Sequence, residues 1–271
     1  MQAWDLKPQE IKERLDKMVW SFSRVQSASA CLYSWYLSYI EGREGLPNAY
    51  AQFGTVCHET LEKFLKGELD IFDVPQYYQE HYSDYVTCDF PPNKYVDLGE
   101  KTYLQGEDYF NNLNFDFDRY EILGVEKEYF FNVGKYPFHG FIDALYRDKE
   151  TGDIVILDHK SSSFKYLKSG GISKSDAEHF LQFRRQEYLY SISIIEEYGK
   201  VDYLSWNMIR DKREIKIPFD KEEFEASKQW AIDTIQTLEQ EVLWSPDNSS
   251  SYFCNVLCNN RDVCSYRQIG G

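Results

Sequence analysis

The segment Ile154–Lys160 (Ile-Val-Ile-Leu-Asp-His-Lys) constrains the fold and the chemistry of this chain more than any other part of the sequence. Its first four residues are apolar and mostly β-branched, which predicts a buried strand. Side chains alternate along a strand, so Asp158 and Lys160 share one face. A carboxylate and an ammonium at the end of a buried strand can hold a cation and a water molecule together, as hydrolysis of a phosphodiester requires.

A second carboxylate strengthens this interpretation. Asp143 lies in the preceding predicted strand, where a hairpin would bring it beside Asp158. An acidic residue inside an apolar strand is costly to bury unless it binds a cation or is paired. An Asp-x-Lys sequence alone would be typical of an exposed salt bridge, but two carboxylates on adjacent strands favour a site for a hard cation.

The order of predicted elements indicates an α/β fold with a mixed sheet. Residues 1–120 are mainly helical, with helices expected at 27–41 and 52–66 and an irregular stretch near 73–98. Consecutive antiparallel strands are expected at 121–133, 136–148 and 154–160, followed by a helix at 175–198, strands at 201–209 and 213–219, and a last helix at 221–243. We expect one domain over 1–271, with a helical part to 120, a β-rich core at 121–217 and a C-terminal part at 218–271.

Composition limits the partners of the chain. Its 45 acidic and 30 basic residues give a formal net charge of −15, so nucleic acid could bind only in a locally basic groove. Basic residues do gather after the Asp-x-Lys strand and near Trp206: Lys165, Lys168, Lys174, Arg184, Arg185, Arg210, Lys212 and Arg213. With Tyr166 and Trp206 as stacking platforms they form a candidate path for nucleic acid, and the alternative is that they are solvated surface charges.

Two absences in the sequence narrow the expectations further. The sequence contains no G-x-x-x-x-G-K phosphate-binding loop, so we expect no ATP-driven motor on this chain. No stretch is long and apolar enough for a membrane span, and the charged N-terminus is unlike a signal peptide. We expect a cytoplasmic protein.

The cysteines predict a metal or cluster site. Cys254, Cys258 and Cys264 are closely spaced near the C-terminus, and Cys31 lies far upstream. Without a secretion signal, disulfides are a poor explanation for these thiols. The two other cysteines, Cys57 and Cys88, have no such spacing and are expected to be ordinary core or surface thiols.

The motifs resemble, in their order, those of the RecB-like and AddB-like exonucleases of the PD-(D/E)XK nuclease superfamily, including CRISPR-associated RecB-like enzymes and their phage relatives. The matching elements are G-x-x-x-H at 54–58, Val-Glu at 125–126, G-x-x-D at 140–143, D-x-K at 158–160 and Q-x-x-x-Y at 186–190. The resemblance implies a restriction-endonuclease-like core, a mixed central sheet flanked by helices. It also implies His58, Asp143 and Asp158 as metal ligands and Lys160 as catalytic base or water-positioning residue.

Further site residues follow from the same resemblance. His159, between Asp158 and Lys160, is an additional candidate ligand, and Glu126 would be an auxiliary acid, although Glu128 shares its strand face. Gln186 and Tyr190 lie one helical turn apart, where they could contact the substrate or brace the site. A histidine ligand suits manganese, so Mn²⁺ or Mg²⁺ is the expected cation.

The resemblance extends to the cysteines. The iron-sulfur members of this family hold a 4Fe-4S cluster with one cysteine near the N-terminus and three near the C-terminus, which implies Cys31, Cys254, Cys258 and Cys264 here. Three residues separate Cys254 from Cys258, where the family more commonly has two. A structural Zn²⁺ held by four thiolates is the alternative.

The function expected from the sequence is therefore that of a metal-dependent DNA exonuclease. Its substrate would be single-stranded DNA or a duplex with an end, and its setting recombination, repair or phage DNA metabolism in a bacterial or phage-infected cell. Recombination or helicase proteins are candidate partners. The alternative is a non-catalytic nucleic-acid-binding or assembly factor that keeps the nuclease fold.

Overall fold

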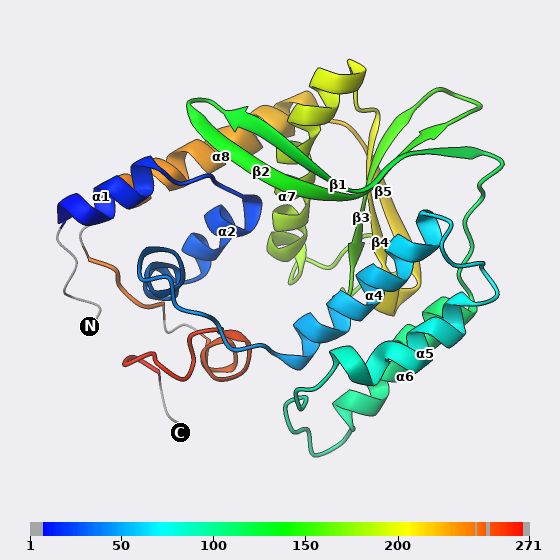
Figure 1. Ribbon diagram of the computed structural model, residues 1–271, viewed down its shortest axis with the longest axis horizontal. Helices are drawn as coiled ribbons and strands as arrows, with labels where there is room; N and C mark the ends of the chain where they lie inside the picture. Colours follow the sequence, from blue (N-terminus) through cyan, green and yellow to red (C-terminus); the bar gives the residue numbers. More distant parts are fainter. Residues whose placement is uncertain (1–7, 242, 248–249, 268–271) are drawn as a thin grey trace. The chain divides into compact units, whose positions relative to one another are not determined.

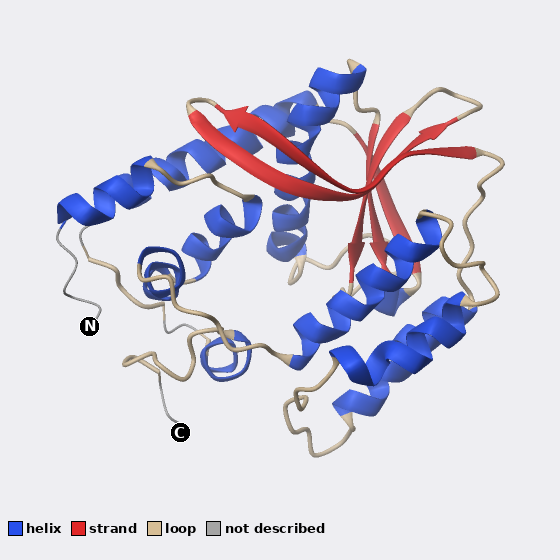
Figure 2. Ribbon diagram, viewed as in Figure 1, coloured by secondary structure: helices blue, strands red, loops and turns tan. Residues whose placement is uncertain are grey.

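A five-stranded mixed sheet organises the computed structural model, which describes residues 8–241, 243–247 and 250–267 (Figures 1 and 2). The strands lie in chain order: β1 (Tyr120–Val133), β2 (Tyr136–Asp148), β3 (Ile154–Lys160), β4 (Tyr203–Met208) and β5 (Arg213–Pro218). β3 is antiparallel to β2 and parallel to β4, and β5 is antiparallel to β4. The predicted α/β fold with a mixed sheet is confirmed.

The register of β2 and β3 brings the two aspartates together. Ala144 pairs with Leu157, so Asp143 and Asp158 come one step further along the same ladder. The parallel pairing of β3 with β4 requires a crossover, which the 22-residue helix α7 (Ala177–Tyr198) provides. This helix ends at Gly199, whose φ of 80° is the left-handed conformation that glycine favours at a helix C-terminus.

Helices cover both faces of the sheet (Figure 1). On one face lie α4 (Ala49–Leu65), α5 (Val74–Tyr85) and α6 (Leu98–Asn111), which share a hydrophobic core with β2 and β3. Val155 and Leu157 of β3 belong to this core. Asp158 and Lys160 point to the other face, because side chains alternate along the strand, and α7 lies there.

A glycine allows α7 to approach the sheet closely. A Cβ atom added at Gly140 of β2 would fall within 3.0 Å of the ring of Tyr190 on α7. The G-x-x-D and Q-x-x-x-Y motifs are therefore physically matched, since the tyrosine ring occupies the space that a larger residue at 140 would need.

The chain divides into two compact units. The sheet unit contains residues 49–129 and 140–224, and the cysteine unit contains the described residues of 1–48, 130–139 and 225–271. In the cysteine unit lie α1 (Pro8–Asp16), α2 (Phe22–Ala30), α3 (Leu32–Trp35), η1 (Tyr36–Ile40), most of α8 (Lys221–Gln240) and η3 (Phe253–Leu257). Its core is aromatic, with Trp35 stacked on Trp20 at 6.2 Å and on Trp244 at 5.5 Å between ring centroids.

Two expectations about the helices are wrong. The helix expected at 27–41 is broken at Cys31, which has extended backbone (φ −166°, ψ 110°) because it ends α2 and begins α3. Its sulfur accepts a hydrogen bond from the N–H of Ser34, as a capping side chain does. The stretch expected to be irregular near 73–98 contains α5, with proline in its first turn.

The remaining elements agree with the expected positions to within three residues at most boundaries. The expectation of a single domain over 1–271 stays a prediction. Among the described residues, no helix has the length and apolar character that crossing a membrane would require.

Candidate active site

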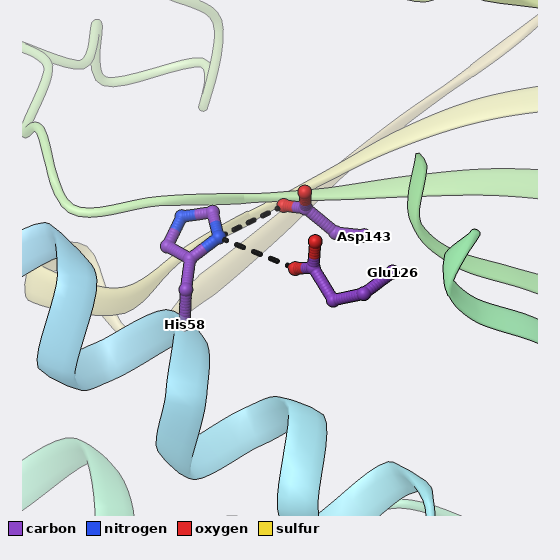
Figure 3. Close-up of side chains that lie close together, drawn as sticks. All are labelled: His58, Glu126 and Asp143. Atoms are coloured by element: carbon purple, nitrogen blue, oxygen red, sulfur yellow. Dashed lines mark ion pairs between the residues drawn. The ribbon is translucent and has the colours of Figure 1, made fainter. Parts of the chain in front are cut away.

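Three potential metal ligands converge in the sheet unit: His58 of α4, Glu126 of β1 and Asp143 of β2 (Figure 3). One ligand atom from each lies within 4.8 Å of the other two. His58 Nδ1 is 3.4 Å from Asp143 Oδ2 and 3.9 Å from Glu126 Oε1. Figure 3 shows the imidazole of His58 reaching from its helix toward both carboxylates.

Local backbone features explain how the three side chains meet. Gly54 lies one helical turn before His58, and a Cβ atom there would meet Ser161 Oγ at 3.0 Å, so the glycine lets α4 approach the end of β3. Glu126 has φ 49°, a left-handed conformation inside a strand. Such a conformation is strained for a residue with a side chain and is typical of functional positions.

The electrostatics of the group show unbalanced negative charge. Burial raises the pKa of Asp143 to about 7, although His58 opposes this shift. Burial disfavours the charged form of His58, but Asp143 and Glu126 together outweigh it and raise its pKa to about 9. The carboxylates therefore attract a positive charge, which is supplied by the imidazolium when no other cation is near.

The same three residues fit a divalent cation. Ligands about 2.1 Å from an octahedral ion lie roughly 3.0 Å apart when adjacent and roughly 4.2 Å apart when opposite, and the two measured separations from His58 Nδ1, 3.4 and 3.9 Å, lie between these values. Two carboxylates and one imidazole form a ligand set that suits Mn²⁺ and also accepts Mg²⁺. A cation would supply the charge that these carboxylates lack.

Asp158, Lys160 and Gln186 form a second group beside the first. Gln186 donates from Nε2 to Asp158 Oδ1 (3.0 Å) and accepts from Lys160 Nζ (3.0 Å). Asp158 Oδ2 lies 2.7 Å from Lys160 Nζ, and among the described residues it has no aligned hydrogen-bond donor. Burial opposes the charge of Lys160, yet Asp158 outweighs this effect and raises the lysine pKa. Lys160 is therefore an ammonium near neutral pH.

One buried group of this region was missed by sequence reasoning. Glu187 of α7 is 1% exposed, and its Oε2 has no hydrogen-bond partner among the described residues. Burial raises its pKa strongly, and Asp158 adds to that effect. Its acidic side chain within an otherwise partly apolar helix could have drawn attention to it. The sequence, however, does not show which side of α7 faces the sheet. Phe183, one turn earlier, lies under Lys160 Nζ at 4.6 Å from its ring centroid.

His159 lies outside the three-residue group, although its ring packs edge-on against that of His58, with 5.9 Å between the ring centroids. Its side chain projects to the face opposite Asp158 and Lys160, with Nδ1 3.0 Å from Asn207 Nδ2. Its backbone N–H, in contrast, donates to Asp143 Oδ2 at 2.7 Å. Burial lowers the pKa of the ring well below its usual value, so the imidazole is neutral. Its ring nitrogens are not among the three converging ligand atoms, and the ligand role expected for His159 stays a prediction.

The other predicted residues are placed as follows. Glu126, and not the exposed Glu128, lies beside His58. Gln186 contacts both members of the Asp-x-Lys pair, whereas Tyr190 is buried against Gly140.

A cavity of about 750 Å³ opens beside His58 and Glu126. Its walls come from α4, Glu68, Glu126 of β1 and Ser161.

The expected nucleic-acid path is only partly available. Trp206 is fully buried, so the expectation that it stacks on bases is wrong. Several of the basic residues have protein partners: Arg184 pairs with Glu223, Arg210 with Gln105, Lys212 with Asp108, and Arg213 with the carbonyl of Gly170. Lys165, Lys168 and Lys174 all lie exposed on the loop that joins Lys160 to α7. Of the predicted path, these three lysines remain the best placed to meet DNA phosphates beside Lys160.

The four predicted cluster cysteines lie in one region of the cysteine unit. Cys31 Sγ accepts from the N–H of Asp247 (3.4 Å), and Cys254 Sγ lies 3.8 Å from the carbonyl oxygen of Asp247. Ser34 Oγ is 3.4 Å from Cys258 Sγ. Burial raises the pKa of Cys254, and the nearby thiols of Cys258, Cys31 and Cys264 raise it further. Among the described residues, however, no three thiol sulfurs lie within 4.8 Å of one another.

Comparison with known proteins identifies the family. The profile of the PD-(D/E)XK nuclease superfamily matches residues 19–269. A crystal structure of a candidate exonuclease from Eubacterium rectale has a TM-score of 0.51 at 11% identity, covering 100% of this chain and 94% of that one. The structure of SSO0001 has a TM-score of 0.31 at 17% identity, covering 91% of this chain and 96% of the other. No curated protein matches. The chain belongs to the PD-(D/E)XK nuclease superfamily.

Proposed function

We propose that this protein is a divalent-metal-dependent deoxyribonuclease that removes nucleotides from DNA ends. The observation that carries the proposal is the convergence of His58, Glu126 and Asp143 beside the buried Asp158–Lys160 pair. Nucleases of this superfamily use divalent metals, and the three converging residues offer a fitting ligand set. The exonucleolytic mode and the choice of DNA rest on the resemblance of the motifs to RecB-like exonucleases.

The ligand residues would act as a unit. His58, Glu126 and Asp143 would hold Mn²⁺ or Mg²⁺, and Asp158 would complete the set from β3. A bound divalent cation neutralises phosphate charge and makes a water molecule more acidic at neutral pH. The N–H of His159 donates to Asp143 Oδ2 and so fixes the orientation of that carboxylate.

Lys160 would position groups and stabilise charge. Burial opposes the charge of Lys160, but Asp158 outweighs this effect and raises the lysine pKa, so the ammonium can donate a hydrogen bond to the attacking water or to a phosphate oxygen. Asp158 and Gln186 contact the ammonium on one side, and the ring of Phe183 lies against it on another. An ammonium held in this way stabilises the charge that develops on the phosphate during hydrolysis.

The substrate would approach through the cavity beside His58. The protein carries a net charge of −15, so attraction of DNA must be local. Lys165, Lys168 and Lys174 on the loop after β3 would meet the backbone phosphates next to the scissile bond. Hydrolysis with release of the 3′ oxygen would leave a 5′ phosphate on the product.

The four cysteines would hold a 4Fe-4S cluster. Around a single tetrahedral zinc ion with Zn–S bonds of about 2.3 Å, the sulfurs lie about 3.8 Å apart. The thiols here are gathered, but among the described residues no three of their sulfurs lie within 4.8 Å of one another. Such spacing suits a cluster better, because each thiolate then binds a different iron atom. The N–H donors at Cys31 Sγ are also typical of cluster ligands.

The test is cleavage of end-labelled single- and double-stranded DNA by anaerobically purified protein with Mn²⁺, Mg²⁺ or chelator. We expect metal-dependent release of short products from one end, and a loss of at least ~100-fold in rate for Lys160→Ala. Lys101→Ala, on the exposed surface of α6, is the matched control and should cleave normally. A folded, metal-loaded protein that cleaves neither substrate would contradict the proposal and favour a non-catalytic binding factor.

A further inference from the structure

A second cavity lies on the face of the sheet opposite Asp158 and Lys160. It measures about 340 Å³ and is formed by α4, the end of α6, the loop at 113–116 and the sheet. Aromatic side chains dominate its walls: Phe64, Tyr109, Phe115, Tyr120 and Tyr146. Its size lies within the range of ~300–1,000 Å³ that is usual for small-molecule sites. Aromatic walls favour a flat, ring-shaped ligand, because such a ligand can stack on them.

A connected polar group borders this cavity. The Nδ2 of Asn207 donates to Tyr109 Oη and to His159 Nδ1, and all three side chains line the cavity. Because His159 Nδ1 accepts, the neutral ring carries its proton on Nε2. That Nε2 is buried and has no hydrogen-bond partner among the described residues. A buried donor without a partner is uncommon in a folded protein and calls for an explanation.

The mouth of the cavity carries the positive charges. Lys212, which follows η2 (Ile209–Asp211), and Arg213, the first residue of β5, lie there, and Arg213 also donates to the carbonyl of Gly170. The acidic residues of the lining have partners within the protein, since Asp116 accepts from the N–H groups of 118 and 119 and Glu214 accepts from Ser205 Oγ. Lys212 also pairs with Asp108, and both of these side chains are about half exposed, so this ion pair is weak and exchangeable.

We propose that this cavity binds a nucleoside 5′-monophosphate, with the base among the aromatic side chains and the phosphate at Lys212 and Arg213. The choice of a nucleotide rests on the proposed function, since nucleoside 5′-monophosphates are products of the exonuclease activity. The aromatic walls can stack on the base, and the Asn207–His159–Tyr109 group can form hydrogen bonds with heteroatoms at the edge of the base. The basic residues at the mouth can bind the phosphate.

The cavity is physically connected to the proposed active site through one residue. The side chain of His159 lines the cavity, and its backbone N–H donates to Asp143 Oδ2 at 2.7 Å. The two sites nevertheless lie on opposite faces of β3, so a ligand in the cavity would not contact Lys160. This separation allows the two sites to be tested independently.

The experiment is calorimetric titration of 2′-deoxyadenosine 5′-monophosphate into the full chain, with chelator present to prevent binding through a divalent cation. We expect saturable binding of one molecule, with an affinity that Lys160→Ala leaves unchanged. 2′-Deoxyadenosine, which lacks the phosphate, should bind at least ~10-fold more weakly, as loss of one charge-assisted contact predicts.

Two kinds of variant test the location. Leu113→Trp should fill the cavity and reduce affinity at least ~10-fold. Lys212→Gly should do the same without harm to the fold, because φ is 48° at this position and glycine adopts that conformation without strain. Lys212→Arg keeps the charge and should keep the affinity. Thermal melting of each variant checks folding.

Three results would overturn the proposal. The first is no binding of the nucleotide, and the second is equal binding of nucleotide and nucleoside. The third is binding that Lys160→Ala abolishes while Leu113→Trp and Lys212→Gly leave it intact, which would place the ligand at the active site. None of these results bears on DNA cleavage, so failure here is distinguishable from failure of the proposed nuclease function.

Discussion

Glu126 combines backbone strain with a position beside His58 and Asp143. A residue with a side chain costs roughly 1–2 kcal/mol in the left-handed conformation, and glycine does not. We expect Glu126→Gly to leave the free energy of unfolding unchanged or to raise it by up to about 1 kcal/mol, while manganese binding weakens at least ~10-fold. Urea unfolding and manganese titration measure the two effects. A variant that binds manganese normally would show that Glu126 is not a ligand.

The raised pKa values of His58 and Asp143 predict a pH dependence. The folded, metal-free protein binds protons at these groups more tightly than the unfolded chain does. Their contribution to stability is therefore lost as pH rises through about 7 for Asp143 and about 9 for His58. A divalent cation needs both groups deprotonated, so its affinity rises over the same interval.

Manganese should therefore raise the melting temperature more at about pH 8.5 than at about pH 6, by several degrees. Differential scanning fluorimetry at both pH values, with and without Mn²⁺, measures this difference. In Asp143→Asn most of the manganese effect should disappear at both pH values. An equal stabilisation of the native protein at the two pH values would contradict the assignment of these ligands.

At the scale of elements, the contact of Gly140 with Tyr190 sets how closely α7 packs on the sheet. Gly140→Ala should destabilise the protein by about 1–3 kcal/mol, because the added methyl group overlaps the tyrosine ring. In a Tyr190→Leu background the same substitution should cost at least ~1 kcal/mol less. Urea unfolding of the four proteins gives this coupling energy. Additive effects would mean that the two residues do not share the space.

The elements also show what sequence could and could not predict. β2 and β3 were predictable because apolar residues occupy most of their positions, and in β3 only Asp158, His159 and Lys160 depart from the apolar run. The Asp143–Asp158 pairing followed from the hairpin that joins them. The break at Cys31 was not predictable, because it depends on a thiol that caps a helix.

The orientation of side chains into the site was harder to predict than the elements. Sequence spacing placed His159 next to two site residues, but alternation along β3 turns its side chain to the other face. Glu187 was missed because helical spacing alone does not reveal which neighbours cover a charged residue. The separation of buried from exposed basic residues required the tertiary contacts of each one.

At the scale of the whole molecule, the cysteines join segments that are far apart in the sequence. Cys31 comes near Cys254, Cys258 and Cys264 in the cysteine unit, more than 200 residues later. We expect anaerobically purified protein to contain about four iron atoms per chain, and Cys258→Ser to lose most of them and to melt at a lower temperature.

Cys88→Ser is the matched control, because Cys88 has no part in this group, and it should keep its iron. Iron, sulfide and zinc analysis of the wild type, Cys258→Ser and Cys88→Ser decides between a 4Fe-4S cluster and a structural zinc ion. One zinc ion per chain and no iron would contradict the cluster and support the structural zinc site instead.

The most direct measurement of the central claim is the manganese dependence of DNA cleavage by the wild-type protein and by His58→Ala, with His81→Ala of α5 as control. If His58 holds the cation, His58→Ala will need at least ~10-fold more Mn²⁺ for half-maximal cleavage, and His81→Ala will match the wild type. The same half-maximal concentration in all three proteins would contradict a metal site at His58, Glu126 and Asp143.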